Sequence, residues 1–178
     1  RVGGHFEAQT NSCVTINDNY VIGDNLWLWR ADHGAGAGSW TSDQSNNGLI
    51  VKGNNVTMYG LAVEHFQKEQ VLWSGENGGT YFYHSELPYD VPVHSQISAS
   101  FVVNSNVAQF NGYGLGIYNY FRSGPAYALS AIKAPNHSGI SFTHMVNGTL
   151  TGPGTVQHMI QTTDGACTPQ TCIGPGAP

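Results

Sequence analysis

The grouping of the apolar residues constrains the fold of this chain more than any other feature of its sequence. These residues lie in short runs rich in β-branched and aromatic side chains, separated by glycine, asparagine and aspartate clusters that are typical of turns. Helical periodicity is scarce. The runs cover residues 25–29, 48–53, 55–63, 70–73, 79–84, 99–103, 106–110, 114–121 and 138–146. This pattern predicts an all-β protein.

The spacing of the runs helps to choose an architecture, because a β-sandwich and a β-solenoid both fit such a set of strands. Similar runs begin near Asn25, Asn55, Thr80, Asn106 and Ser138, at intervals of roughly 25 to 32 residues, which fall in the range that marks repeat architectures. Tight-hairpin signals, such as the Asn-Gly pairs at 47–48 and 111–112, do not join most of the runs. We therefore favour a parallel β-helix and keep the sandwich as the alternative.

The length of 178 residues suits one domain that spans 1–178. In a β-helix, Val51, Val71 and Val102, or their immediate neighbours, are expected to face the core. A net charge of −5, with only six Lys and Arg, argues against nucleic acid or an anionic membrane as the partner. No apolar run approaches the ~20 residues that are needed to span a bilayer.

Three glycosylation sequons and the cysteines bear on the compartment. The sequons begin at Asn55, Asn136 and Asn147, and together with the low lysine content they favour a secreted glycoprotein. The spacing of Cys167 and Cys172 permits a small disulfide loop, which leaves Cys13 without a partner. The alternative is three unrelated reduced thiols.

Two glutamates, Glu64 and Glu86, stand at the ends of consecutive strand-like runs in a chain in which only 10% of residues are charged. If their 22-residue separation is one coil, they stack on one face about 4.8 Å apart along the solenoid. Paired carboxylates suit glycoside hydrolysis, since a like charge nearby raises one pKa and keeps that carboxyl protonated. A carboxyl separation of ~5–5.5 Å would mean retention and ~6.5–9.5 Å inversion, and the spacing leaves both open.

The surroundings of the two glutamates contain side chains suited to sugar rings. Asp32 and His33 precede a glycine-rich turn and are candidate polar groups of a cleft, but no third residue completes a metal-ligand spacing. We therefore expect no metal and no cofactor. The full set of candidate substrate-binding residues is Asp32, His33, His65, Trp73, Tyr83, Tyr89 and Tyr118.

Several of these residues lie in longer motifs. "LWLWRADHG", "GLIVKGNNVTMYGLAVEHFQKEQVLWSGENGGTYFYHSELPYD" and "GYGLGIYNYF" resemble the C-terminal half of family 55 glycoside hydrolases, the exo-β-1,3-glucanases. They are also similar to secreted proteins described as coagulation factor 5/8 type domain proteins. The resemblance runs from about residue 20 to 125 and rests on W-x-A-D-H, Y-G-x-A-V-E-H and a second Glu before Pro-Tyr.

The resemblance implies a right-handed, pectate-lyase-like parallel β-helix that hydrolyses β-1,3-glucan from a chain end with inversion. By motif match, Glu86 falls on the general acid and Glu64 on the carboxylate that holds the nucleophilic water. Leu87 departs from the small polar residue usual there. The family enzymes carry two β-helix domains with the cleft between them. We therefore expect the region around Val2 to Val21 to contact the N-terminal half, another chain or a second copy.

Two rival functions remain open. The first is a non-catalytic carbohydrate-binding β-helix, either a lectin-like module or an inactive hydrolase fragment, which would grip a glycan through the same aromatic residues. The second is a structural solenoid with incidental glutamates, in which the two carboxyl groups would point apart. The separation and orientation of Glu64 and Glu86 are the features that discriminate among these functions.

Overall fold

The computed structural model describes residues 8–35, 37 and 39–162, and this part of the chain consists of strands joined by turns and loops. The strands are β1 (Thr10–Ile16), β2 (Ile22–Asp24), β3 (Trp27–Trp29), β4 (Ser45–Val51), β5 (Thr57–Glu64), β6 (Val71–Trp73), β7 (Gly78–Glu86), β8 (Gln96–Ile97), β9 (Phe101–Val103), β10 (Phe110–Asn119), β11 (Ala126–Ala134), β12 (Ile140–Thr149) and β13 (Gly154–Thr162). Among the residues described, there is no helix long and apolar enough to cross a membrane.

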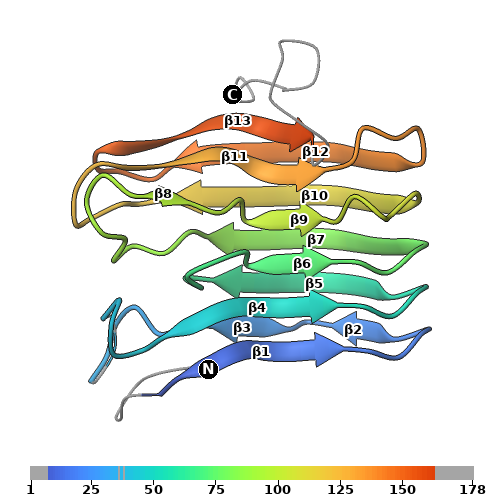
Figure 1. Cartoon of the computed structure of the whole chain (residues 1–178), viewed down its shortest axis with the longest axis horizontal. Coiled ribbons are helices and arrows are strands. Elements are labelled where there is room, and N and C mark those ends of the chain that lie inside the picture. The colour runs from blue at the N-terminus through green and yellow to red at the C-terminus, as the bar shows by residue number, and fades with distance from the viewer. Residues whose placement is uncertain (1–7, 36, 38, 163–178) are drawn as a thin grey trace.

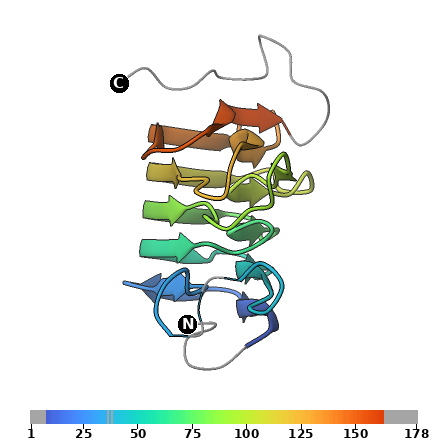
Figure 2. The same cartoon turned by 90° about the vertical axis from the view of Figure 1, so that its left-hand side faces the viewer.

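The strands form two facing sheets, and every pairing within them is parallel. One sheet has seven strands in the order β1-β4-β6-β9-β11-β13, with β8 beside β11. The other has six in the order β12-β10-β7-β5-β2, with β3 beside β5. The chain alternates between the two sheets as it climbs from β1 to β13, so the strands stack as coils (Figures 1 and 2). This confirms the parallel β-helix and excludes the antiparallel sandwich.

The core lies between the sheets and is built from columns of stacked side chains. Because side chains alternate between the two faces of a strand, each coil places its inward residues above those of the coil before. One such column in the seven-stranded sheet runs through Leu49, Val71, Phe101, Ile132 and Ile160. Burial of each large apolar side chain contributes about 1.5–3 kcal/mol.

The predicted core positions are confirmed, with one adjustment. Val51 and Val71 are fully buried in the core. In β9 the neighbours Phe101 and Val103 face the core, while Val102 lines a groove on the outer surface. The alternation of side chains along the strand makes Val102 face outward.

The expected runs locate most strands but not all of them. The patterns missed β1, β2, β8, β11 and β13, and the run predicted at 106–110 is a turn up to the first residue of β10. The stack is therefore taller than the sequence pattern indicated.

A second regularity of the six-stranded sheet is a bend at the same level of every coil. The residues at this level are Asn25, Gly60, Phe82, Gly114 and His144, with φ between 51° and 69°. They lie between registered pairs such as Tyr59↔Tyr81 and Leu61↔Tyr83. Glycine and asparagine adopt this left-handed conformation readily, whereas a phenylalanine there is unusual. We call this set of residues the bend column.

The predicted modification sites differ in their surroundings. Asn136 is exposed in the loop between β11 and β12, and Asn55 is half-buried at a corner with a φ of 56°. The Asn147 side chain turns into the coil and donates to the Val156 carbonyl at 3.4 Å, so a glycan there would have to displace a structural contact. Cys13 is a free, half-buried thiol that packs against the core. The predicted disulfide, Cys167 to Cys172, lies outside the described residues.

Candidate active site

The two glutamates stack in adjacent coils, as their spacing predicted. Ala62 of β5 pairs with His84 of β7, and two residues later the same register brings Glu64 beside Glu86. The backbone follows this register to the strand ends, since the His65 amide donates to the Glu86 carbonyl at 2.9 Å. The same outward column begins with Trp29 of β3 and continues to Tyr118 of β10.

The side chains of Glu64 and Glu86 approach each other on either side of His84. The Nε2 atom of His84 lies 3.4 Å from Glu64 Oε1 and 3.6 Å from Glu86 Oε1. The separation of Glu64 Oε1 and Glu86 Oε1 is therefore at most the sum of their distances to His84 Nε2. The outer oxygens are held by aromatic donors: Trp27 Nε1 donates to Glu64 Oε2 at 2.8 Å, and the Tyr89 hydroxyl donates to Glu86 Oε2. The carboxyl groups converge rather than point apart.

A third carboxylate, Asp32, lies in the loop after β3 and faces the same cluster. Its Oδ1 is 2.7 Å from His33 Nδ1, accepts a hydrogen bond from Trp29 Nε1 at 3.3 Å, and lies 3.6 Å from His65 Nε2. His65 Nε2 is also 3.8 Å from Glu86 Oε2. His65 therefore sits between Asp32 and Glu86 and links the loop carboxylate to the pair.

The surroundings shift the pKa values of Glu64, Asp32 and His65 in different directions. Burial raises the pKa of Glu64, with help from the charges of Glu86 and Asp32 and against the Trp27 hydrogen bond and His84. Burial also acts to raise the pKa of Asp32, but His65 and His33 outweigh it and the pKa is lowered. Burial lowers the pKa of His65, against the opposing pull of Asp32, the Leu87 carbonyl and Glu86. A proton is therefore held more readily on Glu64 than on Asp32.

Tyr89 is a protonated donor over a wide pH range. Burial and its hydrogen bond to Glu86 raise the pKa of its phenol well above the usual value. Its ring packs edge-on against His65, with centroids 4.5 Å apart. This packing fixes the direction from which the hydroxyl reaches Glu86.

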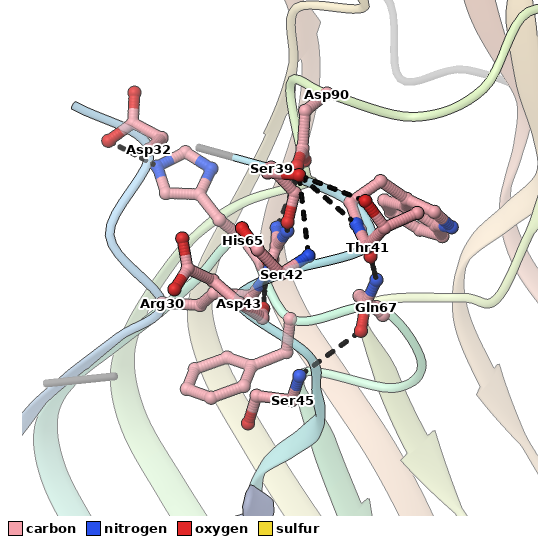
Figure 3. A network of polar contacts seen from close by, with 12 residues as sticks. Arg30, Asp32, Ser39, Thr41, Ser42, Asp43, Ser45, His65, Gln67 and Asp90 are labelled. Atoms are coloured by element: carbon pink, nitrogen blue, oxygen red, sulfur yellow. Dashed lines mark hydrogen bonds and ion pairs between the residues drawn. The ribbon is translucent and has the colours of Figure 1, made fainter. Parts of the chain in front are cut away.

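A fully buried arginine holds the loops behind the site (Figure 3). Arg30 donates through Nε to the Asp43 carbonyl at 2.5 Å, through Nη1 to the His65 carbonyl at 3.0 Å, and through Nη2 to the Ser39 carbonyl at 2.9 Å. It also makes a two-point ion pair with Asp90, at 3.0 and 2.7 Å. All five guanidinium N–H groups thus have partners, which is the arrangement in which a buried charge is tolerated.

This network ties together loops from three coils. Arg30 follows β3, His65 follows β5, and Asp90 lies in the loop after β7. Asp32 and Tyr89 each stand within two residues of a member of the network. The carboxylate cluster is therefore supported by a rigid polar layer rather than by surface loops alone.

The structure brings most of the predicted site residues together. Asp32, His33 and His65 lie with Glu64, Glu86 and Tyr89 in one cluster. Tyr118 borders it, with its ring 5.4 Å from that of His84. His33 forms the solvent side, since 76% of its side chain is exposed.

Two of the predicted sugar-stacking residues are not at the site. Trp73 and Tyr83 are buried in the core, where Trp73 packs against Phe101 and Phe110 and the Tyr83 hydroxyl bonds to Ser100 at 2.8 Å. The physical reason is the alternation along each strand: Tyr83 precedes the outward His84 and therefore points inward. Their predicted role as binding surfaces is wrong.

Four residues of the cluster and its support are not among the predicted site residues, although His84 is one of the side chains suited to sugar rings. Trp27 and His84 share the outward face with Trp29 and Glu86, two residues away in each strand, and alternation could have found them. Trp27 is 62% exposed and stacks on Trp29, with centroids 5.4 Å apart. Arg30 and Asp90 are 60 residues apart in the chain, and their pairing carried no local signal. In the described part of the chain, no three His, Cys, Asp or Glu side chains are placed to hold a metal ion.

Comparison with known proteins gives three findings. Residues 1–86 match the family described as the LAM55 pectate lyase-like domain. The chain is 38% identical over 168 residues to an exo-beta-1,3-glucanase of Streptomyces sp. (strain SirexAA-E / ActE), covering 90% of this chain and 28% of that protein. Its fold resembles the structure of sacteLam55A from Streptomyces sp. SirexAA-E, with a TM-score of 0.82 and 35% identity over 90% of this chain and 31% of that one.

A variant of sacteLam55A in complex with glucose is similar to the same degree, with a TM-score of 0.83 and 34% identity, covering 90% of this chain and 30% of that one. The chain thus spans less than a third of the length of the relatives it matches. These likenesses extend well past the 86 residues of the family match and include both glutamate strands.

Proposed function

We propose that this chain carries the carboxylate pair of a family 55 glycoside hydrolase that acts on β-1,3-glucan. The observation that carries the proposal is the convergence of Glu64 and Glu86 from adjacent coils onto His84, each with its outer oxygen held by an aromatic donor. The likeness to an exo-beta-1,3-glucanase supports the substrate class. Since the chain spans less than a third of that relative, the activity of the whole protein is part of the proposal.

The roles of the two carboxyl groups are those that the family resemblance gives to these positions, with Glu86 as the general acid and Glu64 as the base that holds the water. Glu86 is the more exposed, with 24% of its side chain accessible against 12% for Glu64, so it is the better placed to reach the glycosidic oxygen of a bound chain and, as the acid, to protonate it. As the bond from C1 to that oxygen breaks, water attacks C1 and loses a proton to Glu64. The raised pKa of Glu64 makes its ionised form a stronger base than an ordinary glutamate, and it also means that this base form is present only above the raised pKa. The product is free glucose of inverted configuration, released from a chain end.

One exposed and three half-buried aromatic rings supply the binding surface. Trp27 and Trp29 stack on each other beside Glu64, and Tyr89 and Tyr118 border Glu86. Such rings with convergent carboxylates and a histidine are the usual makeup of a sugar site. These rings and carboxylates lie on one face of the molecule, so within the described part of the chain the site they form has no opposite wall to enclose a bound chain. We therefore propose that the second wall comes from another part of a longer protein or from another chain, as the contact expected around Val2 to Val21 would allow.

The first test replaces each glutamate by glutamine and follows glucose release from a β-1,3-glucan. Glu86→Gln and Glu64→Gln should each lower kcat by about 10²–10⁴-fold, because each removes a proton-transfer group. Glu69→Gln is the control, since Glu69 is a half-buried carboxylate that bonds to Asn47 away from the cluster. Its rate should equal that of the wild type.

The outcomes separate the hydrolase from its rivals. A Glu86→Gln variant that keeps more than a tenth of the wild-type rate would contradict the acid assignment. A wild-type protein that binds the glucan without turnover, with unchanged affinity in both glutamine variants, would identify a carbohydrate-binding module. The anomeric form of the first product, read by proton NMR, tests inversion: α-glucose from a β-linked chain supports it, and β-glucose contradicts it.

We also propose that the protein is secreted. The exposed sequon at Asn136 supports this proposal, because an N-glycan needs an accessible loop. Expression in a eukaryotic secretory host should add a glycan at Asn136 that peptide mapping detects. Asn147 should stay unmodified because its side chain is turned inward. Secretion fails as a proposal if the chain's natural host retains it inside the cell.

A further inference from the structure

Phe82 is unusual both in its backbone conformation and in its exposure to solvent. It lies in the middle of β7 with a φ of 68°, a conformation that costs a non-glycine residue energy, and 76% of it is exposed. Neither core packing nor backbone preference explains a phenylalanine here. At the same bend, neighbouring coils have residues that adopt a positive φ readily, such as Gly60 and Gly114. A strained, exposed aromatic residue points to a role toward something outside the fold.

The two glycines also leave the Phe82 ring uncovered. Gly60 and Gly114 occupy the bend column in the coils on either side of Phe82, and a Cβ placed on Gly114 would lie 3.8 Å from Phe82 Cδ2. The neighbouring tyrosines differ, because Tyr59 and Tyr81 stack at 5.4 Å and 21° and so cover each other's faces. Phe82 is therefore much more exposed, at 76%, than Tyr59 at 46% or Tyr81 at 38%.

Phe82 shares one surface with the carboxylate pair. It precedes Glu86 by four residues in the same strand, about 13 Å along the sheet at ~3.3 Å per residue, a span of a few sugar rings. We call the outward residues before His84 on the six-stranded sheet the aromatic face: Thr57, Tyr59, Tyr81, Phe82, Asn111, Tyr113, Ser141 and Thr143. Tyr59, Tyr81 and Tyr113 stand in register on it and are each more than a third exposed.

The chemistry of the aromatic face matches an uncharged, hydroxyl-rich polymer. Its members are aromatic, hydroxyl or amide side chains. At its borders lie Asp24, beside the tyrosine column, and the bend-column residue His144, whose ring packs 5.0 Å from that of Tyr113. Apolar ring faces flanked by hydroxyls and amides suit the alternating apolar and polar edges of a sugar chain. A nucleic acid or an anionic lipid surface would require the lysine and arginine side chains that this face lacks.

We propose that Phe82 forms a binding subsite for a glucosyl unit of the substrate chain, several units away from the bond that is cleaved. The subsite rests on the proposed glucanase function and extends it, because it makes affinity depend on chain length. Glucan leaving the carboxylate pair runs along β7 toward the bend column and places one ring on Phe82.

The test compares two glycine variants that relieve the same backbone strain. Phe82→Gly is matched by Tyr20→Gly, since Tyr20 has a φ of 62° and is 77% exposed in the turn before β2, outside the aromatic face. Glycine suits both positions, so both variants should keep or raise Tm relative to their parent. A loss of binding in Phe82→Gly is then not a failure to fold.

Binding of β-1,3-gluco-oligosaccharides of increasing length is measured by calorimetry in the Glu86→Gln background. Affinity of this parent should rise with length, and Phe82→Gly should weaken binding of the long oligosaccharides by about threefold to tenfold. Binding of the disaccharide should stay within twofold. Tyr20→Gly should match the parent at every length.

Three results would overturn the subsite: no gain of affinity with length in the parent, equal binding of long chains by Phe82→Gly and its parent, or an equal loss for the disaccharide. These readouts are independent of turnover. If wild-type protein shows no hydrolysis but Phe82→Gly still loses affinity for long chains, the hydrolase proposal fails and the subsite stands.

Discussion

At the scale of single residues, the cluster separates the titration of groups that are chemically alike. Glu64 and Asp32 are both carboxylates shielded from water, yet the pKa of Glu64 is raised and that of Asp32 is lowered. The difference lies in their neighbours. Two histidines beside Asp32 lower its pKa. At Glu64, the charges of Glu86 and Asp32 raise the pKa and oppose the lowering by the Trp27 hydrogen bond and by His84.

Trp27→Phe tests the role of the one direct hydrogen bond to Glu64. The indole N–H stabilises the ionised carboxylate, so its loss should raise the pKa of Glu64 further. If Glu64 must be ionised to accept a proton, the acidic limb of kcat/KM against pH should move to higher pH. Trp29→Phe is the control, because it removes a donor to Asp32, whose lowered pKa keeps it ionised in that range. A limb that moves equally in both variants would contradict this assignment.

His65 makes stability depend on pH. Its pKa is lowered in the folded protein from the ordinary 6.5, so as pH falls below 6.5 the unfolded chain takes up a proton that the native protein does not. The free energy of unfolding should therefore fall on acidification through this range. Glu64, with its raised pKa, acts in the opposite sense at lower pH, as pH falls toward its ordinary 4.5.

His65→Asn isolates this contribution, since asparagine tolerates the φ of 68° at this position. Urea unfolding of wild type and variant at a series of pH values should show a smaller loss of stability below pH 6.5 in the variant. Parallel pH dependences in the two proteins would show that His65 is not the group responsible. The Glu64 contribution is common to both and cancels in the comparison.

At the scale of single strands, side-chain alternation decides between core and site. Trp73→Ala should destabilise the fold by about 3–5 kcal/mol, because it leaves a cavity between Phe101 and Phe110. Tyr113→Ala, at an exposed position in the tyrosine column, should cost less than about 1 kcal/mol. Urea midpoints measure both. A small cost for Trp73→Ala together with lost glucan binding would restore Trp73 as a binding residue.

The sequence allowed prediction of those strands whose composition is strongly β-like. Glu64 and Glu86 could be placed together because 22 residues is one coil between β5 and β7 and both runs contain aromatic and β-branched residues. β11 was not predicted because several of its inward side chains are small, including those of Ala126, Ala128 and Ala134, and alanine has a low strand propensity. Trp73 and Tyr83 were misplaced since an aromatic residue suits a core and a sugar site equally, and only the exact register distinguishes them.

At the scale of the whole molecule, each coil is stabilised mainly by the coils next to it. β1 and β13 end the seven-stranded sheet, and β2 and β3 pair only with β5 among the described strands. Amide exchange followed by mass spectrometry should therefore show the strongest protection in β5, β7, β9 and β10 and the weakest in β1 to β3. Uniform protection along the stack would instead indicate that the solenoid opens as one unit.

The exchange experiment also bears on the site. Trp27, Trp29 and Asp32 come from the coil with β3, whereas Glu64, Glu86 and Tyr118 come from the inner coils. Arg30 binds the two parts together through His65 and Asp90. We expect protection in the segment after β3 to exceed that of β1 for this reason.

The two corners of the coil differ in length. The segments that leave the seven-stranded sheet are all short: 17–21, 52–56, 74–77, 104–109 and 135–139. The segments that leave the six-stranded sheet, beside the carboxylates, vary in length from the short segment 150–153 to the long segment 30–44. The coils repeat after 22, 30, 32 or 35 residues, and the segments beside the carboxylates account for most of this variation in length. Insertions at that corner would lengthen the rim around Glu86 while every stacked column keeps its register. Variants of this scaffold, natural or engineered, can therefore change the loops around the carboxylates by changing loop length alone.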